Sequence, residues 1–240
     1  MTARFFAFGC SYTAFAWPTW SDFVGVKFPG NYYNYGRSGA ANNFIFHHFI
    51  EMHERHRFNK DDLIIIQWTE MMRESRYLNS QWHNNGSVAI SYPKEYIKQY
   101  VDPRGFLIRD MTMIAAVTQI LDSIGCEYHY LSLNQFAFSE DISGLYTPYL
   151  NLMKPSYQTV IGELKSRTLC KRILIKDPHP TPGEHYKFLS QVLPQWAPED
   201  DTLANAWDQQ LADSWYTHAE GWESTWPGID RGFLETYPGL

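Results

Sequence analysis

Short apolar runs alternate with amphipathic stretches along the chain as far as Pro198. The run Leu63–Trp68 is the strongest, and its unbroken apolar character is typical of a central parallel strand covered on both faces. Apolar residues recur at helical spacing over Asn42–Phe58 and Arg104–Ile124, which predicts two long helices. This alternation indicates an α/β fold, with a mostly parallel five-stranded sheet between layers of helices. The expected strands are Phe5–Phe8, Tyr32–Tyr35, Leu63–Trp68, Glu127–Leu133 and Arg172–Lys176.

Two stretches between these elements show no clear period, and we expect Met71–Tyr100 and Asn134–Pro155 to be long loops. Because loops of this length in a compact domain are commonly functional, we interpret Met71–Tyr100 as one wall or lid of a site. Gly125 is expected to end the helix that precedes it. Shorter helices are expected at Trp17–Val24, with Pro18 in the first turn, and at Ser156–Leu164 and Glu184–Trp196.

The alternating pattern stops after Pro198. Residues 199–240 contain one expected acidic helix, Glu199–Asp213, followed by Trp, Tyr and Phe residues among glycines and prolines. We therefore predict a domain at 1–198 and an aromatic C-terminal extension at 199–240. Two roles stay open for the extension: it packs over the domain as a strap, or it docks on a partner protein or a second copy through its aromatic side chains.

Charge and cysteine content exclude several classes of function. The formal net charge is −6 and no basic run occurs, which argues against a nucleic-acid binder or a protein of anionic membrane surfaces. The three cysteines, Cys10, Cys126 and Cys170, are odd in number and widely spaced, so they predict neither a disulfide framework nor a zinc site. No apolar run approaches the roughly 20 residues that span a bilayer, and no leader precedes the first strand. We expect a soluble, cytoplasmic protein.

Four histidines, His47, His48, His53 and His56, lie on the expected helix Asn42–Phe58. Some of them share a helix face, but the HExxH pattern of a zinc site is missing. We interpret them as histidines of the polar face, and we expect neither a metal site nor a cofactor.

Candidate chemistry begins where the first strand ends, at Gly9-Cys10-Ser11. Gly9 permits a tight turn, and a residue just beyond a parallel strand lies at the carboxyl edge of the sheet, where α/β folds bind ligands. Ser11 alone is either a turn former or a candidate nucleophile. Cys10 is an alternative nucleophile because a thiolate is intrinsically stronger, but nothing in the sequence activates it, and a buried small residue is the favoured interpretation.

A second motif, Asp177-x-His179, follows the last expected strand. The carboxyl ends of parallel strands face one side of the sheet, so His179 can meet Ser11. A serine hydroxyl is a poor nucleophile until a base takes its proton, and a carboxylate fixes the tautomer of that base. We therefore predict Ser11 as the nucleophile, His179 as the base and Asp177 as the residue that orients it.

Together these motifs resemble the SGNH (GDSL-like) hydrolase family over about residues 4–196. Gly9-Cys10-Ser11 resembles the family's Gly-Asp-Ser block, Asn34–Gly39 matches Asn-x-Gly-x-Ser-Gly, and Asp177, His179 and Pro180 match the Asp-x-(x)-His-Pro block. The resemblance implies a flavodoxin-like three-layer α/β/α sandwich and hydrolysis or transfer of O-acyl esters. It also implies that the N–H groups of Ser11 and Gly39 hold the oxyanion.

The third family block, Gly-x-Asn-Asp, is altered to Gln67-Trp68-Thr69-Glu70. Thr69 then replaces the asparagine that donates to the oxyanion, and loss of one such donor costs roughly 10²–10³ in rate in other enzymes. Cys10 likewise replaces the aspartate of the first block. This combination is similar to divergent members encoded by tailed bacteriophages, which would place the protein in the virion instead of the cytoplasm.

Two functional hypotheses follow from the sequence. The first is a serine esterase, with an acylated glycan, such as an O-acetyl sugar, as substrate because abundant aromatic rings can stack on sugars. For this substrate we expect binding by Trp68, Glu70, Arg73 and Trp82. The second is a catalytically degenerate domain that serves as a structural or binding module, for instance in a phage particle. Thr69 and the aromatic extension motivate this second hypothesis.

Overall fold

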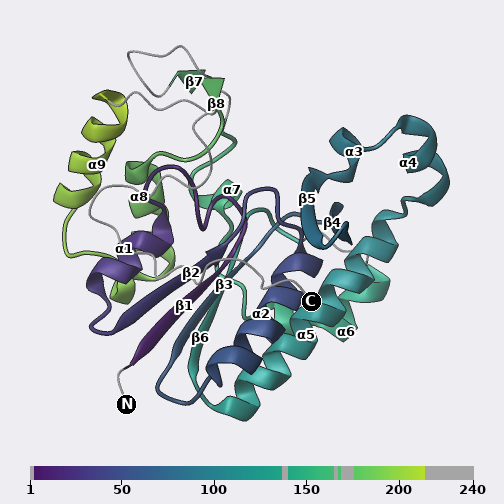
Figure 1. The fold of residues 1–240 in the computed structure, drawn as a ribbon, viewed down its shortest axis with the longest axis horizontal. Helices are drawn as coiled ribbons and strands as arrows, with labels where there is room; N and C mark the ends of the chain where they lie inside the picture. The colour runs from purple at the N-terminus through teal and green to yellow at the C-terminus, as the bar shows by residue number, and fades with distance from the viewer. Residues whose placement is uncertain (1–2, 137–139, 165–166, 169–175, 214–240) are drawn as a thin grey trace.

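The computed structural model describes residues 3–136, 140–164, 167–168 and 176–213. Its centre is a parallel sheet with the strand order β2-β1-β3-β6 (Figure 1). The four predicted strands from the first part of the chain are confirmed. They are β1 (Arg4–Gly9), β2 (Asn31–Gly36), β3 (Leu63–Trp68) and β6 (Glu127–Ser132).

The prediction of a fifth strand in this sheet is wrong for the described part of the chain. All of Arg172–Lys176 except Lys176 lies outside the described residues. Lys176 belongs to β8 (Lys176–Asp177), which pairs antiparallel with β7 (Arg167–Thr168) and not with the sheet. The outer edge of β6 is instead contacted by a later segment, since Tyr130 bridges to Met153 in parallel and its carbonyl accepts from the Lys154 N–H at 3.0 Å.

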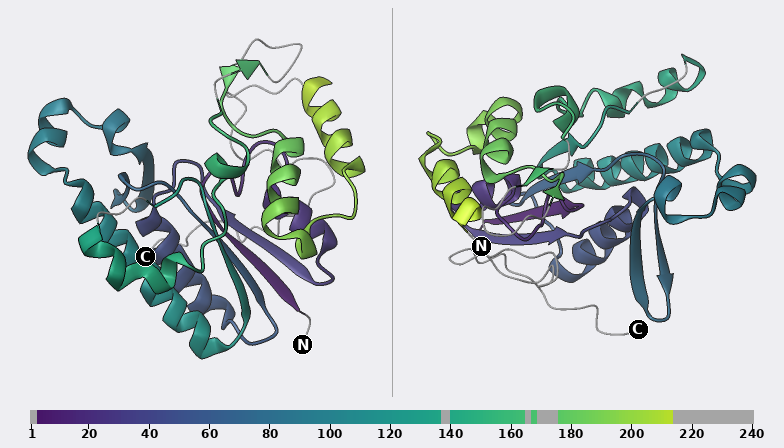
Figure 2. Two further views of the ribbon diagram at one scale, coloured as in Figure 1. Left: turned by 180° about the vertical axis from the view of Figure 1, so that it is seen from behind. Right: turned by 90° about the horizontal axis from the view of Figure 1, so that it is seen from above.

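Helices cover both faces of the sheet, which confirms the predicted three layers (Figures 1 and 2). Along β1, Phe6 and Phe8 point into the core beneath α2 (Asn42–His56) and α5 (Pro103–Ile124). The alternate residues Phe5 and Ala7 point into a second core on the opposite face. That core is covered by α1 (Trp20–Lys27), α8 (Pro182–Val192) and α9 (Thr202–Asp213).

The expected loop Met71–Tyr100 is instead mostly regular structure. It forms an antiparallel hairpin, followed by two short helices. Asn79 and Ser80 make the hairpin turn, and both have positive φ, as a tight two-residue hairpin connection requires. The strands carry mostly polar residues, so no apolar pattern marked them. The elements are β4 (Arg73–Leu78), β5 (Gln81–Ser87), α3 (Val88–Ser91) and α4 (Lys94–Tyr100).

Other boundaries also differ from the sequence expectations. Asn134–Pro155 contains the helix α6 (Glu140–Leu150), and Ser156–Leu164 contains only the single turn α7 (Tyr157–Val160). The helix expected at Trp17–Val24 begins later, because Thr19 and not Pro18 provides its N-cap. The helix expected at Glu184–Trp196 begins at Pro182, where Thr181 and Glu184 form a capping box, and its last part is the 3₁₀ turn η1 (Pro194–Trp196). Gly125 ends α5 with φ of 72°, as expected.

The acidic helix expected at Glu199–Asp213 forms as α9, and it is integrated into the core. Trp207 packs on Phe23 of α1 with ring centroids 4.7 Å apart, and Ala204 is fully buried. The aromatic residues expected to act as a strap or anchor lie in 214–240, outside the described residues. The boundary at residue 198 therefore stays a prediction.

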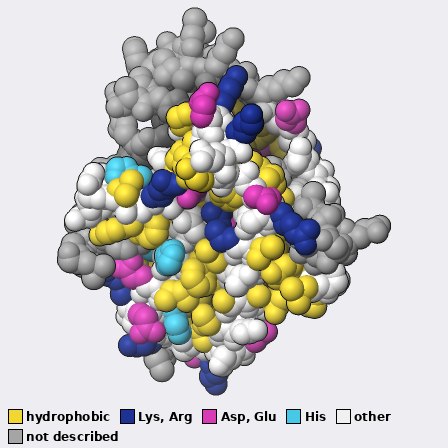
Figure 3. Space-filling model, turned by 90° about the vertical axis from the view of Figure 1, so that its right-hand side faces the viewer, with side chains coloured by type: hydrophobic (Ala, Val, Ile, Leu, Met, Phe, Trp, Pro, Cys, Tyr) yellow, Lys and Arg dark blue, Asp and Glu magenta, His cyan; other side chains and the backbone are white. Residues whose placement is uncertain are grey.

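The side of the molecule that carries α3 to α6 exposes several hydrophobic side chains (Figure 3). Within the described ranges these include Ile90, Tyr100, Ile108 and Leu145. Among the helices of those ranges, none has both the length and the apolar character needed to cross a membrane.

Candidate active site

Ser11 lies on a tight turn immediately after β1. The carbonyl of Cys10 accepts hydrogen bonds from the N–H groups of Thr13 and Ala14 at 2.9 and 3.2 Å, which closes the turn. Gly9 is required there, because a Cβ would lie 2.1 Å from Oγ1 of Thr13. Cys10 is fully buried below the turn, as the favoured interpretation held. The turn thus brings Ser11 to the carboxyl edge of the sheet.

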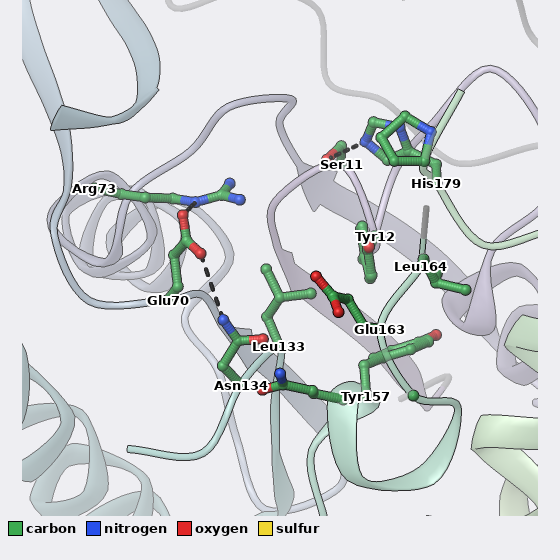
Figure 4. A pocket seen from close by; sticks show the side chains of 13 residues that line it. Ser11, Tyr12, Glu70, Arg73, Leu133, Asn134, Tyr157, Glu163, Leu164 and His179 are labelled. Carbon is green, nitrogen blue, oxygen red and sulfur yellow. Dashed lines mark hydrogen bonds and ion pairs between the residues drawn. The ribbon is translucent and has the colours of Figure 1, made fainter. Parts of the chain in front are cut away.

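The three predicted catalytic residues meet at this edge. His179 Nε2 lies 2.8 Å from Ser11 Oγ, and His179 Nδ1 lies 2.7 Å from Asp177 Oδ1 (Figure 4 shows the Ser11–His179 contact). The backbone N–H of His179 also donates to Asp177 Oδ1 at 2.7 Å. A carboxylate next to Nδ1 favours the tautomer with its proton on Nδ1, which leaves the Nε2 lone pair facing the Ser11 hydroxyl.

Aromatic side chains hold the imidazole of His179 in place. The Phe15 ring stacks on it with centroids 3.9 Å apart, and Tyr12 lies beside it at 5.5 Å. The indole N–H of Trp17 donates to the carbonyl of Pro180 at 2.7 Å, which fixes the chain just after the histidine. The imidazole is thus held by ring packing as well as by Asp177.

Gly39 belongs to the turn that follows β2, the strand beside β1. β1 and β2 pair in register up to Gly9 and Gly36, and the Arg37 N–H donates to the Gly9 carbonyl at 3.0 Å. Gly39 has φ of +70°, and a Cβ there would lie 2.4 Å from the Asn84 carbonyl oxygen of the hairpin. In the described part of the chain, no acceptor takes the N–H of either Gly39 or Ser11.

The structure does not present the hydroxyl of Thr69 to the site. The side chain is 1% exposed, and its Oγ1 has no hydrogen-bond partner among the described residues. Asn42 binds the Thr69 main chain, since its side chain accepts from the Thr69 N–H at 2.8 Å and donates to the carbonyl at 3.2 Å. The Asn42 amide also donates to Asp110, whose pKa is raised by burial. The third predicted oxyanion donor thus belongs to the interior.

Ser11 and His179 line a cavity of about 360 Å³ (Figure 4). Two of the four predicted substrate-binding residues, Glu70 and Arg73, also line it, and the Arg73 Nε donates to Glu70 Oε1 at 3.2 Å. The Glu70 carboxylate accepts from Asn134 Nδ2 at 3.4 Å on its other side. The cavity therefore combines the hydrogen-bonded Ser11–His179 pair with a charged, hydrogen-bonding wall.

The other two predicted substrate-binding residues, Trp68 and Trp82, do not line this cavity. Trp68 is the last residue of a fully buried strand, and its side chain packs edge to face on Tyr130 in the core. The hairpin holds Trp82 against α2, where its ring lies 5.4 Å from Phe44 and 5.5 Å from His47. Both tryptophans are packing residues, contrary to the sequence prediction.

Sequence reasoning missed several residues of the cavity wall, namely Tyr12, Asn134, Tyr157, Gln158 and Glu163. Asn134 could have been found, because it follows β6 at the same carboxyl edge as Ser11. Tyr157 and Glu163 come from a segment that was expected to be a continuous helix, and they carry no motif.

Beneath the cavity, the Tyr157 hydroxyl contacts His185 Nδ1. Both side chains are almost fully buried, and burial lowers the pKa of His185 well below its usual value while it raises the pKa of Tyr157. His185 is therefore neutral, and it takes no part in the Ser11–His179 contact.

Burial also corrects the interpretation of one helix histidine. His48 is 5% exposed and lies between the rings of Tyr35 and Phe44, so it is a core residue and not part of a polar face. His47, its neighbour, is exposed. No group of three or more His, Cys, Asp and Glu side chains within the described ranges is arranged to hold a metal ion.

The fold and the site together define an α/β protein with a Ser–His–Asp relay at the carboxyl edge of a parallel sheet. No family model matches the chain, and no curated protein has a significant match. Two similar solved structures are proteins of the lipolytic G-D-S-L family. The first, from Desulfitobacterium hafniense DCB-2, has a TM-score of 0.44 and 14% identity over 80% of this chain and 98% of its own. The second, from Veillonella parvula DSM 2008, has a TM-score of 0.41 and 12% identity over 80% of this chain and 99% of its own. Both TM-scores are below 0.5 and both identities are low, so the proposed function depends on the geometry of the site and not on these two structures.

Proposed function

We propose that this protein is a serine hydrolase that cleaves O-acyl esters. The observation that carries the proposal is the relay from Ser11 Oγ through His179 to Asp177, with contacts of 2.8 and 2.7 Å at the wall of a cavity. A hydroxyl in such a relay loses its proton as it attacks, which makes it an effective nucleophile at neutral pH.

In the proposed reaction, Ser11 Oγ attacks the ester carbonyl carbon while His179 Nε2 takes the hydroxyl proton. The imidazolium then protonates the alcohol oxygen as the carbon–oxygen bond breaks, and the acyl group stays on Ser11. Water attacks this acyl group, and His179 takes a proton from the water and returns it to Ser11 Oγ as the carboxylic acid leaves. Asp177 remains ionised and stabilises the imidazolium in both steps.

The oxyanion that forms in each step is held by backbone N–H groups of Ser11 and Gly39. Neither group donates to another acceptor in the described part of the chain. Donors fixed in advance by the fold stabilise developing charge without reorganisation. The turn conformations of both residues supply this rigidity.

For the substrate we propose a hydroxyl-rich ester with a small acyl group, such as an O-acetyl sugar. The cavity wall offers carboxylate and amide groups from Glu70, Asn134 and Gln158, which suit hydroxyl groups as donors and acceptors. The rings of Tyr12 and Tyr157 line the same cavity and provide apolar area with little conformational freedom to lose.

A second candidate function is a binding module that lacks turnover, for instance as a component of a virus particle. The observation in its favour is the burial of Thr69, which leaves the cavity without the side-chain oxyanion donor that the family resemblance implies. Under this alternative the cavity binds its ligand and Ser11 has no special reactivity.

Intact-mass measurement after incubation with a fluorophosphonate separates the two functions. The wild type is compared with Ser11→Ala and His179→Ala, and Ser190→Ala serves as a matched control because it removes a serine of α8 that does not line the cavity. The fold of each variant is checked by circular dichroism.

We expect one adduct on the wild type and on the control, and none on the two site variants. Turnover of acetylated sugars by the wild type, faster than turnover of long-chain esters, would then support the proposed substrate. A folded wild type without an adduct would refute the hydrolase and leave the binding module.

A further inference from the structure

The helix α9 packs on α8, the helix that begins just after the loop carrying His179. Residues of α9 come after the predicted domain boundary at residue 198. We propose that Asp208 and Leu211 of α9 are positioning residues that hold His179 in reach of Ser11. The proposal rests on the proposed function, because it takes His179 as the catalytic base. Asp208 and Leu211 are three positions apart and therefore lie on one face of α9, which faces α8 and the Ser11 turn.

Asp208 binds the start of α8, a few residues after His179. Its Oδ1 accepts the Gly183 N–H at 2.9 Å, and its Oδ2 accepts from the Thr181 hydroxyl at 3.5 Å. The Gly183 N–H is one of the donors that a helix start leaves without an intrahelical partner. The approach depends on glycine, because a Cβ at position 183 would lie 2.3 Å from Asp208 Oδ2.

Leu211 acts on His179 indirectly, through the aromatic residues that pack beside the imidazole. It is 2% exposed and forms a small core with Phe15, Ala16 and Trp17. Phe15 is the ring that stacks on His179, and the Trp17 indole donates to the Pro180 carbonyl. One face of α9 therefore contacts both the start of α8, which follows His179 in the chain, and the ring of Phe15, which stacks on His179.

The segment from Pro178 to the start of α8 at Pro182 is too stiff to absorb a displacement. Pro178, Pro180 and Pro182 alternate with His179 and Thr181, and each proline fixes its own φ. A shift of the α8 start is therefore carried to the imidazole. Misplacement of a reacting group by 1 Å can slow a reaction about 100-fold.

The test uses the full chain and measures the rate of fluorophosphonate labelling per folded molecule. Asp208→Ala removes the acceptor, and Gly183→Ala displaces it by a clash. Asp208→Asn keeps an acceptor oxygen and is the rescue variant. Ala204→Gly is the matched control, because it weakens the buried face of the same helix and leaves the contacts to the His179 loop intact.

A second readout does not depend on Ser11. The proton on Nδ1 of His179, held by Asp177, gives a low-field proton NMR resonance that is assigned by its loss in His179→Ala. A purely structural role of α9 would lower the melting temperature of the variants, but it would change neither this resonance nor the labelling rate of the folded molecules.

We expect Asp208→Ala and Gly183→Ala to label about tenfold more slowly than the wild type and to lose the resonance. Asp208→Asn should stay within about threefold, and Ala204→Gly should match the wild type in rate and resonance. Wild-type rates and an intact resonance in Asp208→Ala and Gly183→Ala would overturn the positioning role. A wild type that shows the resonance but does not label would instead overturn the proposed function, and the resonance alone would then decide the role of Asp208.

Discussion

Acid should destabilise this protein through His48, a histidine that is neutral in the folded state. Burial, together with the nearby Arg37 and Arg55 guanidinium groups, lowers the pKa of His48 to about 3. The side chain lies among the rings of Phe8 and Tyr35, which offer no counter-charge for an imidazolium. In the unfolded chain its pKa returns to the ordinary value of about 6.5.

The sign of the effect follows from proton uptake. Between pH 6.5 and about 3, the unfolded state holds a proton on His48 that the folded state does not, so the free energy of unfolding falls as the pH falls. One pKa unit corresponds to about 1.4 kcal/mol, so the free energy of unfolding falls by roughly 2–3 kcal/mol between pH 7 and pH 4.5. This is a large part of the roughly 5–15 kcal/mol that stabilises a typical domain.

Urea denaturation of the wild type and of His48→Leu at pH 7.0, 5.5 and 4.5 measures this contribution. The variant should lose roughly 2–3 kcal/mol less than the wild type over this range, whatever its stability at pH 7.0. The control is His47→Leu on the same helix, because it also removes an imidazole, but an exposed one. Equal pH dependence in the wild type and His48→Leu would refute the assignment of a buried, neutral His48.

Three further predictions concern the site. Asp177→Asn should fold normally but label with fluorophosphonate about 10⁴-fold more slowly, because an amide stabilises the wrong tautomer of His179; labelling kinetics and circular dichroism check this. Gly39→Ala should lower the free energy of unfolding by about 2 kcal/mol, measured by urea denaturation, because its positive φ and the 2.4 Å approach to Asn84 both exclude a Cβ. Thr69→Val should leave the labelling rate within about twofold and raise the free energy of unfolding by about 1 kcal/mol, because it removes a buried hydroxyl without a partner; labelling slowed 100-fold would instead mean that the hydroxyl reaches the oxyanion.

The sequence was most informative where one local signal decided the structure. The run Leu63–Trp68 could be assigned as a central strand because each of its side chains is buried. The meeting of Ser11 and His179 was predicted correctly, but from a fifth parallel strand that the sheet does not contain, since Lys176 and Asp177 pair antiparallel with β7. Asp177 followed from its place two residues before His179.

The direction of individual side chains, and strands made of polar residues, could not be predicted from the sequence in this way. Trp68 and Glu70 are close in sequence, yet the first points into the core and the second into the cavity, and no periodicity decides this at the end of a strand. The hairpin around Asn79 was missed because its strands carry polar residues and its turn lacks glycine. Of the strand expected at Arg172–Lys176, the structure describes only Lys176, which pairs with Thr168 of β7 and not with the sheet, because an apolar pattern does not show the partner of a strand.

The burial of Thr69 changes what the altered third block means. Thr69 stands where the family resemblance implies an oxyanion-binding asparagine. The amide at this end of β3 is that of Asn42, the first residue of α2, and it does not line the cavity. Asn42 binds both main-chain polar groups of Thr69 and passes its remaining hydrogen bond to Asp110. That amide fixes the course of the chain into Glu70, so it shapes the cavity wall without touching the cavity. Oxyanion binding in the proposed reaction then depends on the backbone N–H groups of Ser11 and Gly39. Because one missing donor costs roughly 10²–10³ in rate, we expect a slow enzyme. Its specificity would come from the polar wall of the cavity.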